Sequence, residues 1–221
     1  MPTEKTEDMT PEELRTPLLA AMLQHVPFDG WSTAALKLAA KDSAISAEMA
    51  ELAFPRGAIE ALELHLRQAD KNLAHALADK NVQAMKIREG ITEGIRTRLK
   101  MPSTNREVVR RGLAVLALPQ NIALGSKSLW RTADIMWKAV GDTSTDHNWY
   151  TKRATLSAVY SAVLLYWLND DSEDYADTWA FLDRRIEGVM KFEKTKFQIK
   201  KALENAPSLA RFLGRLRYPG I

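Results

Sequence analysis

The chain has 221 residues, a net charge of +3 and no cysteine, which excludes disulfide bonds and thiolate chemistry. A chain of this length can bury a good core, either as one domain or as a small domain joined to a larger one. It is rich in Ala, Leu, Glu, Lys and Arg and shows little strand-like alternation, which predicts an all-α fold.

The positive charge is concentrated at the C-terminal end. Residues 184–221 carry a net charge of +7, which leaves −4 for the rest of the chain. A basic tail suggests an anionic partner, either nucleic acid or lipid headgroups, and a solvated final helix is the alternative. The first eight residues are acidic and polar, unlike a signal or transit peptide, and this predicts a cytoplasmic location.

Helical periodicity, capping residues and breakers divide the chain into short and long helices. Three short helices come first, and the turn between the second and third gives a helix-turn-helix outline. The longer helices follow, with a short final element after Pro207. The predicted ranges are 11–26, 33–41, 47–54, 57–81, 82–101, 105–118, 122–140, 146–169, 175–205 and 207–219.

The helix predicted over 146–169 is central to the domain. No charged residue occurs from Ala154 to Asn169, and a helix apolar nearly all round must be buried on most sides. The apolar run is shorter than the roughly 18 to 20 residues of a membrane span. One face carries the large side chains of Leu156, Tyr160, Val163 and Trp167, and another carries small residues at 154, 157, 158, 161 and 162.

Two classes of function receive no support from these residues. The third helix offers Glu48 and Glu51 and no cation before Arg56, which opposes contact with a phosphate backbone. The four histidines are scattered, and the chain has no Glu-x-x-His pair, glycine-rich phosphate loop or serine elbow. We therefore expect no DNA binding, no catalytic residue, no metal and no cofactor.

Three stretches carry a family resemblance. They are Pro27-Phe28-Asp29-Gly30-Trp31, the block from Gly141 through Asp146-His147-Asn148-Trp149-Tyr150 to Ala154, and Asp177-Thr178-Trp179 to Ile186. From about residue 12 to 193 the chain resembles the ubiquinone (coenzyme Q) biosynthesis accessory family, whose mitochondrial member is the ninth protein of that pathway. The helix order also resembles the TetR-type architecture.

The resemblance implies a TetR-like fold that has lost DNA binding, a lipid cavity, a homodimer and service to the hydroxylase that acts on demethoxyubiquinone. Without a mitochondrial leader, the chain resembles a bacterial member, peripheral on the inner membrane. The implied domains are 1–56, 57–193 and a basic amphipathic tail over 194–221. The family's hydroxylase-docking patch matches Asp134, Ile135, Met136, Trp137, Trp149, Tyr150 and Arg153.

Large and small apolar side chains supply material for a lipid cavity, although the same residue types also fill a solid core. The resemblance favours the cavity, which would bind an isoprenoid quinone intermediate or a phospholipid. The candidate lining residues are Leu113, Leu116, Leu129, Val159, Val163, Leu164, Trp167, Trp179 and Phe181.

The end of the chain forms an amphipathic pattern. Leu209, Phe212, Leu213 and Leu216 share a helical stripe, and Arg211, Arg215 and Arg217 lie off it. A short basic amphipathic helix suits a lipid interface; docking of the stripe onto the protein itself is the alternative.

The sequence therefore predicts a non-catalytic, lipid-binding accessory protein of ubiquinone biosynthesis. It would present a polyisoprenoid intermediate to the hydroxylase at the membrane. A ligand-responsive TetR-like regulator is the alternative, and an undescribed helical enzyme is a third possibility.

Overall fold

The computed structural model describes residues 9–101 and 105–204, with side chains as far as Lys191, and this part of the chain is helical without any strand. The all-α prediction is confirmed for this part of the chain. The helices are α1 (Pro11–Asp29), α2 (Thr33–Asp42), α3 (Ala47–Ala53), α4 (Ala58–Asp79), α5 (Ile87–Lys100), α6 (Arg106–Leu116), α7 (Ile122–Ala139), α8 (His147–Trp167) and α9 (Ala176–Glu204), with short 3-10 turns at Val82–Ala84, Pro119–Asn121 and Glu173–Tyr175.

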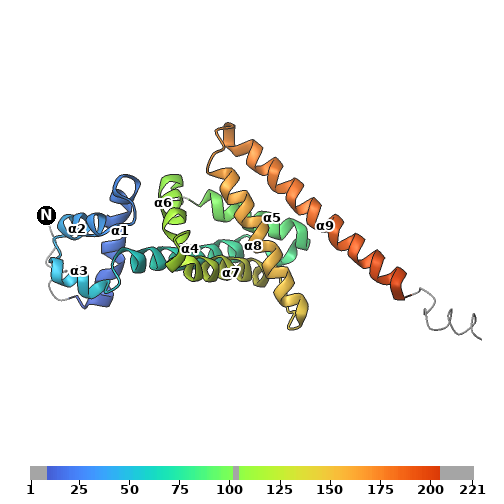
Figure 1. The fold of residues 1–221 in the computed structure, drawn as a ribbon, viewed down its shortest axis with the longest axis horizontal. Helices are drawn as coiled ribbons and strands as arrows, with labels where there is room; N and C mark the ends of the chain where they lie inside the picture. Colours follow the sequence, from blue (N-terminus) through green and yellow to red (C-terminus); the bar gives the residue numbers. More distant parts are fainter. Residues whose placement is uncertain (1–8, 102–104, 205–221) are drawn as a thin grey trace, which may run out of the picture.

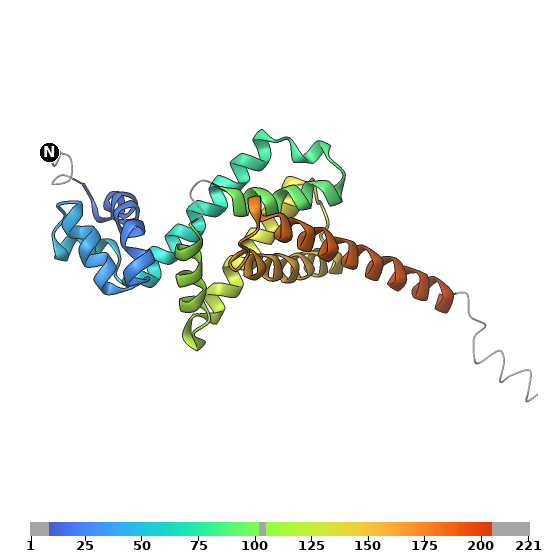
Figure 2. The ribbon, with the colours of Figure 1, turned by 90° about the horizontal axis from the view of Figure 1, so that it is seen from above.

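Figure 1 shows how these helices are arranged. Helices α1 to α3 form a unit at one end, and α4 runs from that unit into the larger body made by α5 to α9. In Figures 1 and 2 the C-terminal half of α9 projects away from the body. The docking and lipid-binding residues predicted from the sequence all lie in the larger body, and the predicted membrane-binding residues follow α9 in the chain.

The first helix is longer than predicted. It begins with a capping box between Thr10 and Glu13, and it continues through Pro27 to Asp29, three residues past the expected end at Val26. Proline removes one helical hydrogen bond but does not by itself end this helix. The stop is Gly30, which adopts φ +68° and donates its N–H to the Val26 carbonyl at 2.9 Å.

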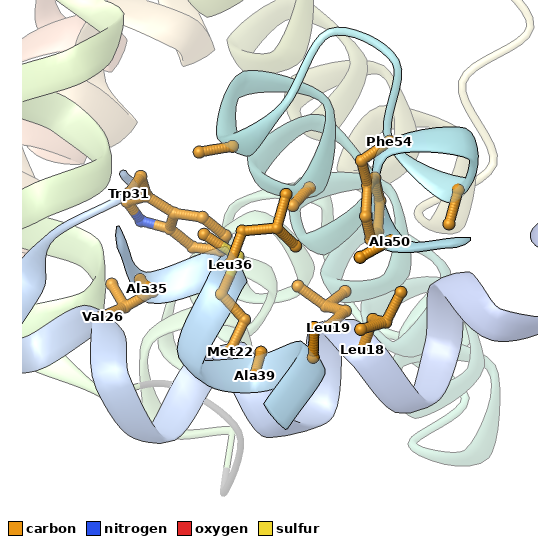
Figure 3. Close-up of a cluster of buried hydrophobic side chains, with 14 of the residues drawn as sticks. Leu18, Leu19, Met22, Val26, Trp31, Ala35, Leu36, Ala39, Ala50 and Phe54 are labelled. Atoms are coloured by element: carbon orange, nitrogen blue, oxygen red, sulfur yellow. The ribbon is translucent and has the colours of Figure 1, made fainter. Parts of the chain in front are cut away.

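The N-terminal unit has its own hydrophobic core, shown in Figure 3. Trp31 closes this core and joins it to the body, because its indole N–H donates to the Val108 carbonyl at 3.3 Å and its ring lies 5.4 Å from that of His65. The core also includes Ala58 and Leu62 of α4. The labelled side chains of Figure 3 are Leu18, Leu19, Met22, Val26, Trp31, Ala35, Leu36, Ala39, Ala50 and Phe54.

The long region after Gly57 is broken where the sequence suggested only a junction. Asn81 takes a left-handed conformation, and Met85 and Lys86 are extended, so α5 begins at Ile87 instead of Val82. This break turns α5 back beside α4, with which it packs.

The central helix of the sequence is α8, and it packs against α7 and α9. Its large-residue face, Leu156, Tyr160, Val163 and Trp167, is buried as predicted. Its face of small residues is divided, because Ser157 is buried whereas Ala154 and Ala158 are exposed. An apolar helix surface therefore faces outward beside α9.

The connection from α8 to α9 is held by one carboxylate. Asp170 is buried and accepts hydrogen bonds from the backbone N–H and the hydroxyl of both Ser172 and Thr178, at 2.5 to 2.9 Å. Burial opposes its ionisation, but the hydrogen bonds outweigh burial, so the pKa of Asp170 lies well below its usual value.

Candidate functional site

Three aromatic rings gather where α7 meets the start of α8. Trp149 and Tyr150 lie edge to face with centroids 4.8 Å apart, and Trp130 of α7 lies 5.6 Å from Trp149 and 6.4 Å from Tyr150. Tyr150 is 61% exposed. We call Trp130, Trp149 and Tyr150 the aromatic platform. Trp130 was not among the docking residues predicted from the sequence, although it lies four residues before Asp134 and therefore on the same side of that predicted helix.

A buried set of charges lies under the platform. Arg153 is 1% exposed, and its guanidinium donates to Asp134 at 2.6 Å, to Asp142 at 3.0 Å and to the Trp149 carbonyl at 3.2 Å. It also lies 4.3 Å from the Trp149 ring centroid. Lys152 donates to Asp142 at 2.7 Å. We call Asp134, Asp142, Lys152 and Arg153 the charge cluster.

The pKa values of both carboxylates in the cluster, Asp134 and Asp142, are lowered. Burial disfavours the charged form of Asp142, but hydrogen bonds from Lys152, Ser144 and Arg153 outweigh burial and hold the pKa of Asp142 well below its ordinary range. Asp142 lies in the loop after α7, so the cluster fixes that loop and the first turn of α8 together.

The structure divides the predicted docking residues into two groups. Tyr150 is exposed, and Asp134, Ile135, Trp137 and Trp149 are partly exposed. The other two, Met136 and Arg153, are each only 1% exposed, so neither can contact a partner in this conformation. Their role as contact residues is therefore corrected: Met136 packs in the core, and Arg153 supports Trp149 from below.

The larger body contains a partly open cavity of about 100 Å³ between α4, α5, α6, α7 and α8. Most of its wall is aliphatic, but His65, Arg98, Ser128, Thr132 and Tyr160 also line it. These polar residues were not predicted, because nothing in their local sequence distinguishes a cavity wall from a helix packing face.

Four of the predicted lipid-binding residues, Leu113, Leu116, Leu129 and Leu164, line this cavity. The other five do not. Val163 and Trp167 fill the solid core instead, because their face of α8 packs against neighbouring helices. Val159 lies beside α9 in a separate open groove, and the remaining two side chains lie outside the cavity on α9: Trp179 near the cations of Arg96 and Lys100, and Phe181 stacked on Tyr166 at 4.6 Å.

Small side chains and cations line a second surface along α8 and α9. Ala158 and Ala162 of α8 face Gly188 of α9, and Arg184 and Arg185 line the same groove. We call these five residues the α8–α9 face. Beyond Ala162 an acidic hollow follows, lined by Asp171 and Asp177 among others.

Helix α3 presents an acidic and apolar surface. Glu48 and Glu51 are exposed, and Leu52 is 60% exposed. Arg56, the first cation after α3, forms ion pairs with Glu60 and Glu63. This surface opposes contact with nucleic acid.

The predicted membrane-binding residues, Leu209, Arg211, Phe212, Leu213, Arg215, Leu216 and Arg217, lie outside the described residues. Within residues 9–101 and 105–204 no helix has the length and hydropathy needed to span a bilayer, and no group of three or more acidic or histidine side chains is placed to hold a metal ion.

The COQ9 family model matches residues 122–193, which include the aromatic platform, the charge cluster and the first half of α9. A rat protein named "Ubiquinone biosynthesis protein COQ9, mitochondrial" is 34% identical over 209 residues, covering 91% of this chain and 67% of that protein. The chain belongs to the COQ9 family. The human protein of the same name is 32% identical over 209 residues, covering 91% of this chain and 65% of that protein.

Membership of the COQ9 family shows a role in ubiquinone biosynthesis, while the chain spans about two thirds of the length of these relatives. The expected location on a bacterial inner membrane is contradicted, because the relatives are named mitochondrial proteins and come from eukaryotes. An acidic, polar N-terminal sequence therefore does not identify the compartment.

A solved structure shares the fold of this COQ9 family chain. It is the TetR transcriptional regulator from Nitrosomonas europaea ATCC 19718, with a TM-score of 0.64 and 18% identity, covering 79% of this chain and 96% of that one. The likeness confirms the TetR-like fold that the helix order predicted, and at this identity it carries no further conclusion.

Proposed function

We propose that the protein is a non-catalytic lipid-binding accessory factor that presents a polyisoprenoid quinone intermediate to the demethoxyubiquinone hydroxylase. The observation that carries the proposal is an apolar cavity in the same helical body as a separate, exposed aromatic platform. A long isoprenoid tail makes its substrate nearly insoluble, so transfer to an enzyme requires an apolar surface that shields the tail.

The resting cavity, at about 100 Å³, accepts only a small part of such a ligand. An engineered cavity of about 150 Å³ in another protein binds benzene, so this one takes about one ring or one isoprene unit. Helix α6 is the wall that can give way, because only Val108 and Gly112 of its residues are buried. We propose that α6 moves outward to admit the tail.

Lipid binding is tested by extracting lipid from the purified protein and by titrating it with isoprenoid quinones. Leu113→Trp places a large side chain in the cavity and should remove binding. Leu52→Trp, on the exposed surface of α3, is the matched control and should not. If no isoprenoid or phospholipid co-purifies or titrates, the lipid-binding role is wrong.

The aromatic platform is proposed to dock the hydroxylase. Trp and Tyr are enriched at the centres of interfaces because they bury a large area with few rotamers to freeze. Trp149→Ala and Tyr150→Ala should each weaken binding more than about tenfold, the loss expected for a central aromatic contact. Leu52→Ala removes an exposed side chain elsewhere and should leave binding unchanged. Normal complex formation by both aromatic variants would refute the docking role.

A homodimer through the α8–α9 face is also proposed. Small residues allow helices to approach closely, and Ala162 borders both the groove with Arg184 and the hollow with Asp177. A twofold axis near Ala162 would place the basic end of one copy over the acidic end of the other. Ala162→Arg should then give a monomer in sedimentation experiments, and an unchanged mass would exclude this face.

The tail beyond α9 is proposed to hold the protein at the membrane. Three cations near an anionic surface contribute roughly 1 kcal/mol each, which gives a useful and reversible attraction. Deletion of residues 207–221 should reduce flotation with anionic liposomes, while unchanged flotation would rule out this role.

A further inference from the structure

One side of the cavity is polar although the rest of its wall is aliphatic. Ser128 is 5% exposed, lines the cavity, and its hydroxyl has no hydrogen-bond partner among the described protein atoms. Arg98 and Tyr160, both buried, line the same cavity. A buried hydroxyl without a partner costs free energy, so Ser128 favours a ligand that offers it an oxygen.

The charges near this wall are one cation that lines the cavity, Arg98, and one carboxylate behind the wall, Asp70. Burial and the neighbouring charge of Arg98 lower the pKa of His65 to about 4, so the imidazole is neutral at ordinary pH. The nearby carboxylate of Asp70 is already engaged, since it accepts from Arg131 at 2.5 Å and from Thr132 at 2.7 Å. An oxygen with lone pairs, or partial negative charge, is therefore favoured in the cavity.

Size restricts the ligand further. A cavity of about 100 Å³, smaller than the one of about 150 Å³ that holds benzene, takes at most one six-membered ring and not a chain of isoprene units. The rings of quinones and hydroquinones combine this size with polar oxygens at the ring edge. A hydrocarbon tail would pack against the aliphatic wall, but it would leave the hydroxyl of Ser128 without a hydrogen-bond partner.

We infer that the polar wall of the cavity receives the oxygen-bearing aromatic ring of the ligand, so that the headgroup, not the end of the tail, is the part held in the cavity. Ser128 donates to a ring oxygen, and Arg98 and Tyr160 supply further donors. The inference rests on the proposed lipid-binding function and specifies its ligand class. It also means that the reactive ring is shielded from water until it is transferred.

Phenol and toluene provide a matched pair of probes, because they have similar size and differ in one oxygen. The hydrogen bond is isolated by the ratio of the phenol affinity to the toluene affinity, measured by calorimetry in the unmodified protein and in Ser128→Ala, because the desolvation cost of the phenol hydroxyl is common to both proteins. Ser128→Ala should remove about fivefold of the phenol affinity and leave that for toluene unchanged. Ser157→Ala is the control, because that hydroxyl is also buried and unpartnered but does not line the cavity.

An affinity ratio of phenol to toluene that Ser128→Ala does not change would overturn the inference. A third probe, the isoprenoid hydrocarbon squalene, separates this failure from failure of the proposed function. Binding of squalene, with a phenol-to-toluene ratio that Ser128→Ala leaves unchanged, would indicate a lipid-binding protein that holds tails only. If phenol, toluene and squalene all failed to bind, the proposed lipid-binding function would fall as well.

Discussion

Replacing Arg153 by methionine tests whether the charge cluster holds the aromatic platform in place. The side chain is 1% exposed and contacts Asp134, Asp142 and the Trp149 carbonyl, so Arg153→Met removes the central cation and keeps most of the apolar stem. Breaking a buried ion pair from one side costs about 3 to 5 kcal/mol, because the other charge is left uncompensated.

The cost should lie near the lower limit of that range. Asp134 keeps an ion pair with Lys138 at 2.7 Å, and Asp142 keeps one with Lys152 at 2.7 Å. We expect a loss of about 3 kcal/mol in the free energy of unfolding, or about 6 to 12 °C in Tm for a chain of this size. The platform should loosen, so hydroxylase binding should weaken at temperatures where the variant is still folded.

Urea unfolding followed by tryptophan fluorescence measures the first effect, and co-purification with the hydroxylase measures the second. Lys138→Met is the control: this side chain is 67% exposed, and its ion pair one helical turn away contributes about 0.3 to 0.5 kcal/mol. An Arg153→Met protein within about 1 kcal/mol of the unmodified chain would show that the cluster does not stabilise the start of α8.

Three further predictions follow from other parts of the structure. The pKa values of Asp142 and Asp170 are depressed in the folded state, so both ionised carboxylates stabilise the fold above the ordinary carboxyl pKa, and this stabilisation is lost as the pH falls below it. Urea unfolding at a series of acidic pH values should show the loss. Asp170→Asn should make the free energy of unfolding depend less on pH. Gly90→Ala should lower the free energy of unfolding in urea by about 1 to 2 kcal/mol, because the new Cβ would lie 2.5 Å from the branched side chain of Val140. Gly94→Ala meets a flexible methionine and should be nearly neutral. Similar losses for both variants would contradict this packing. A gel-shift assay at low salt should detect no binding to duplex DNA, and salt-sensitive binding would instead favour the regulator.

The sequence alone determined the features that depend on residues close together in the chain, such as helix ends and the composition of helix faces. The large-residue face of the apolar run in α8 is buried as its pattern predicted, whereas Ala154 and Ala158 of the same run are exposed. The acidic third helix led us to expect no phosphate partner, from its own composition. Helix ends could be placed because capping residues and breakers act within a few positions of one another, and the resulting helix order resembles the TetR-type architecture.

Tertiary packing decided which side chains are available for function. Arg153 and Tyr150 are three residues apart, yet one is buried against two aspartates and the other is exposed, because only the position of α7 defines the inner side of the first turn. Val163 and Leu164 are adjacent in the sequence, yet Val163 fills the core and Leu164 lines the cavity. A cavity is the space that five helices leave between them, so no single stretch of sequence specifies it.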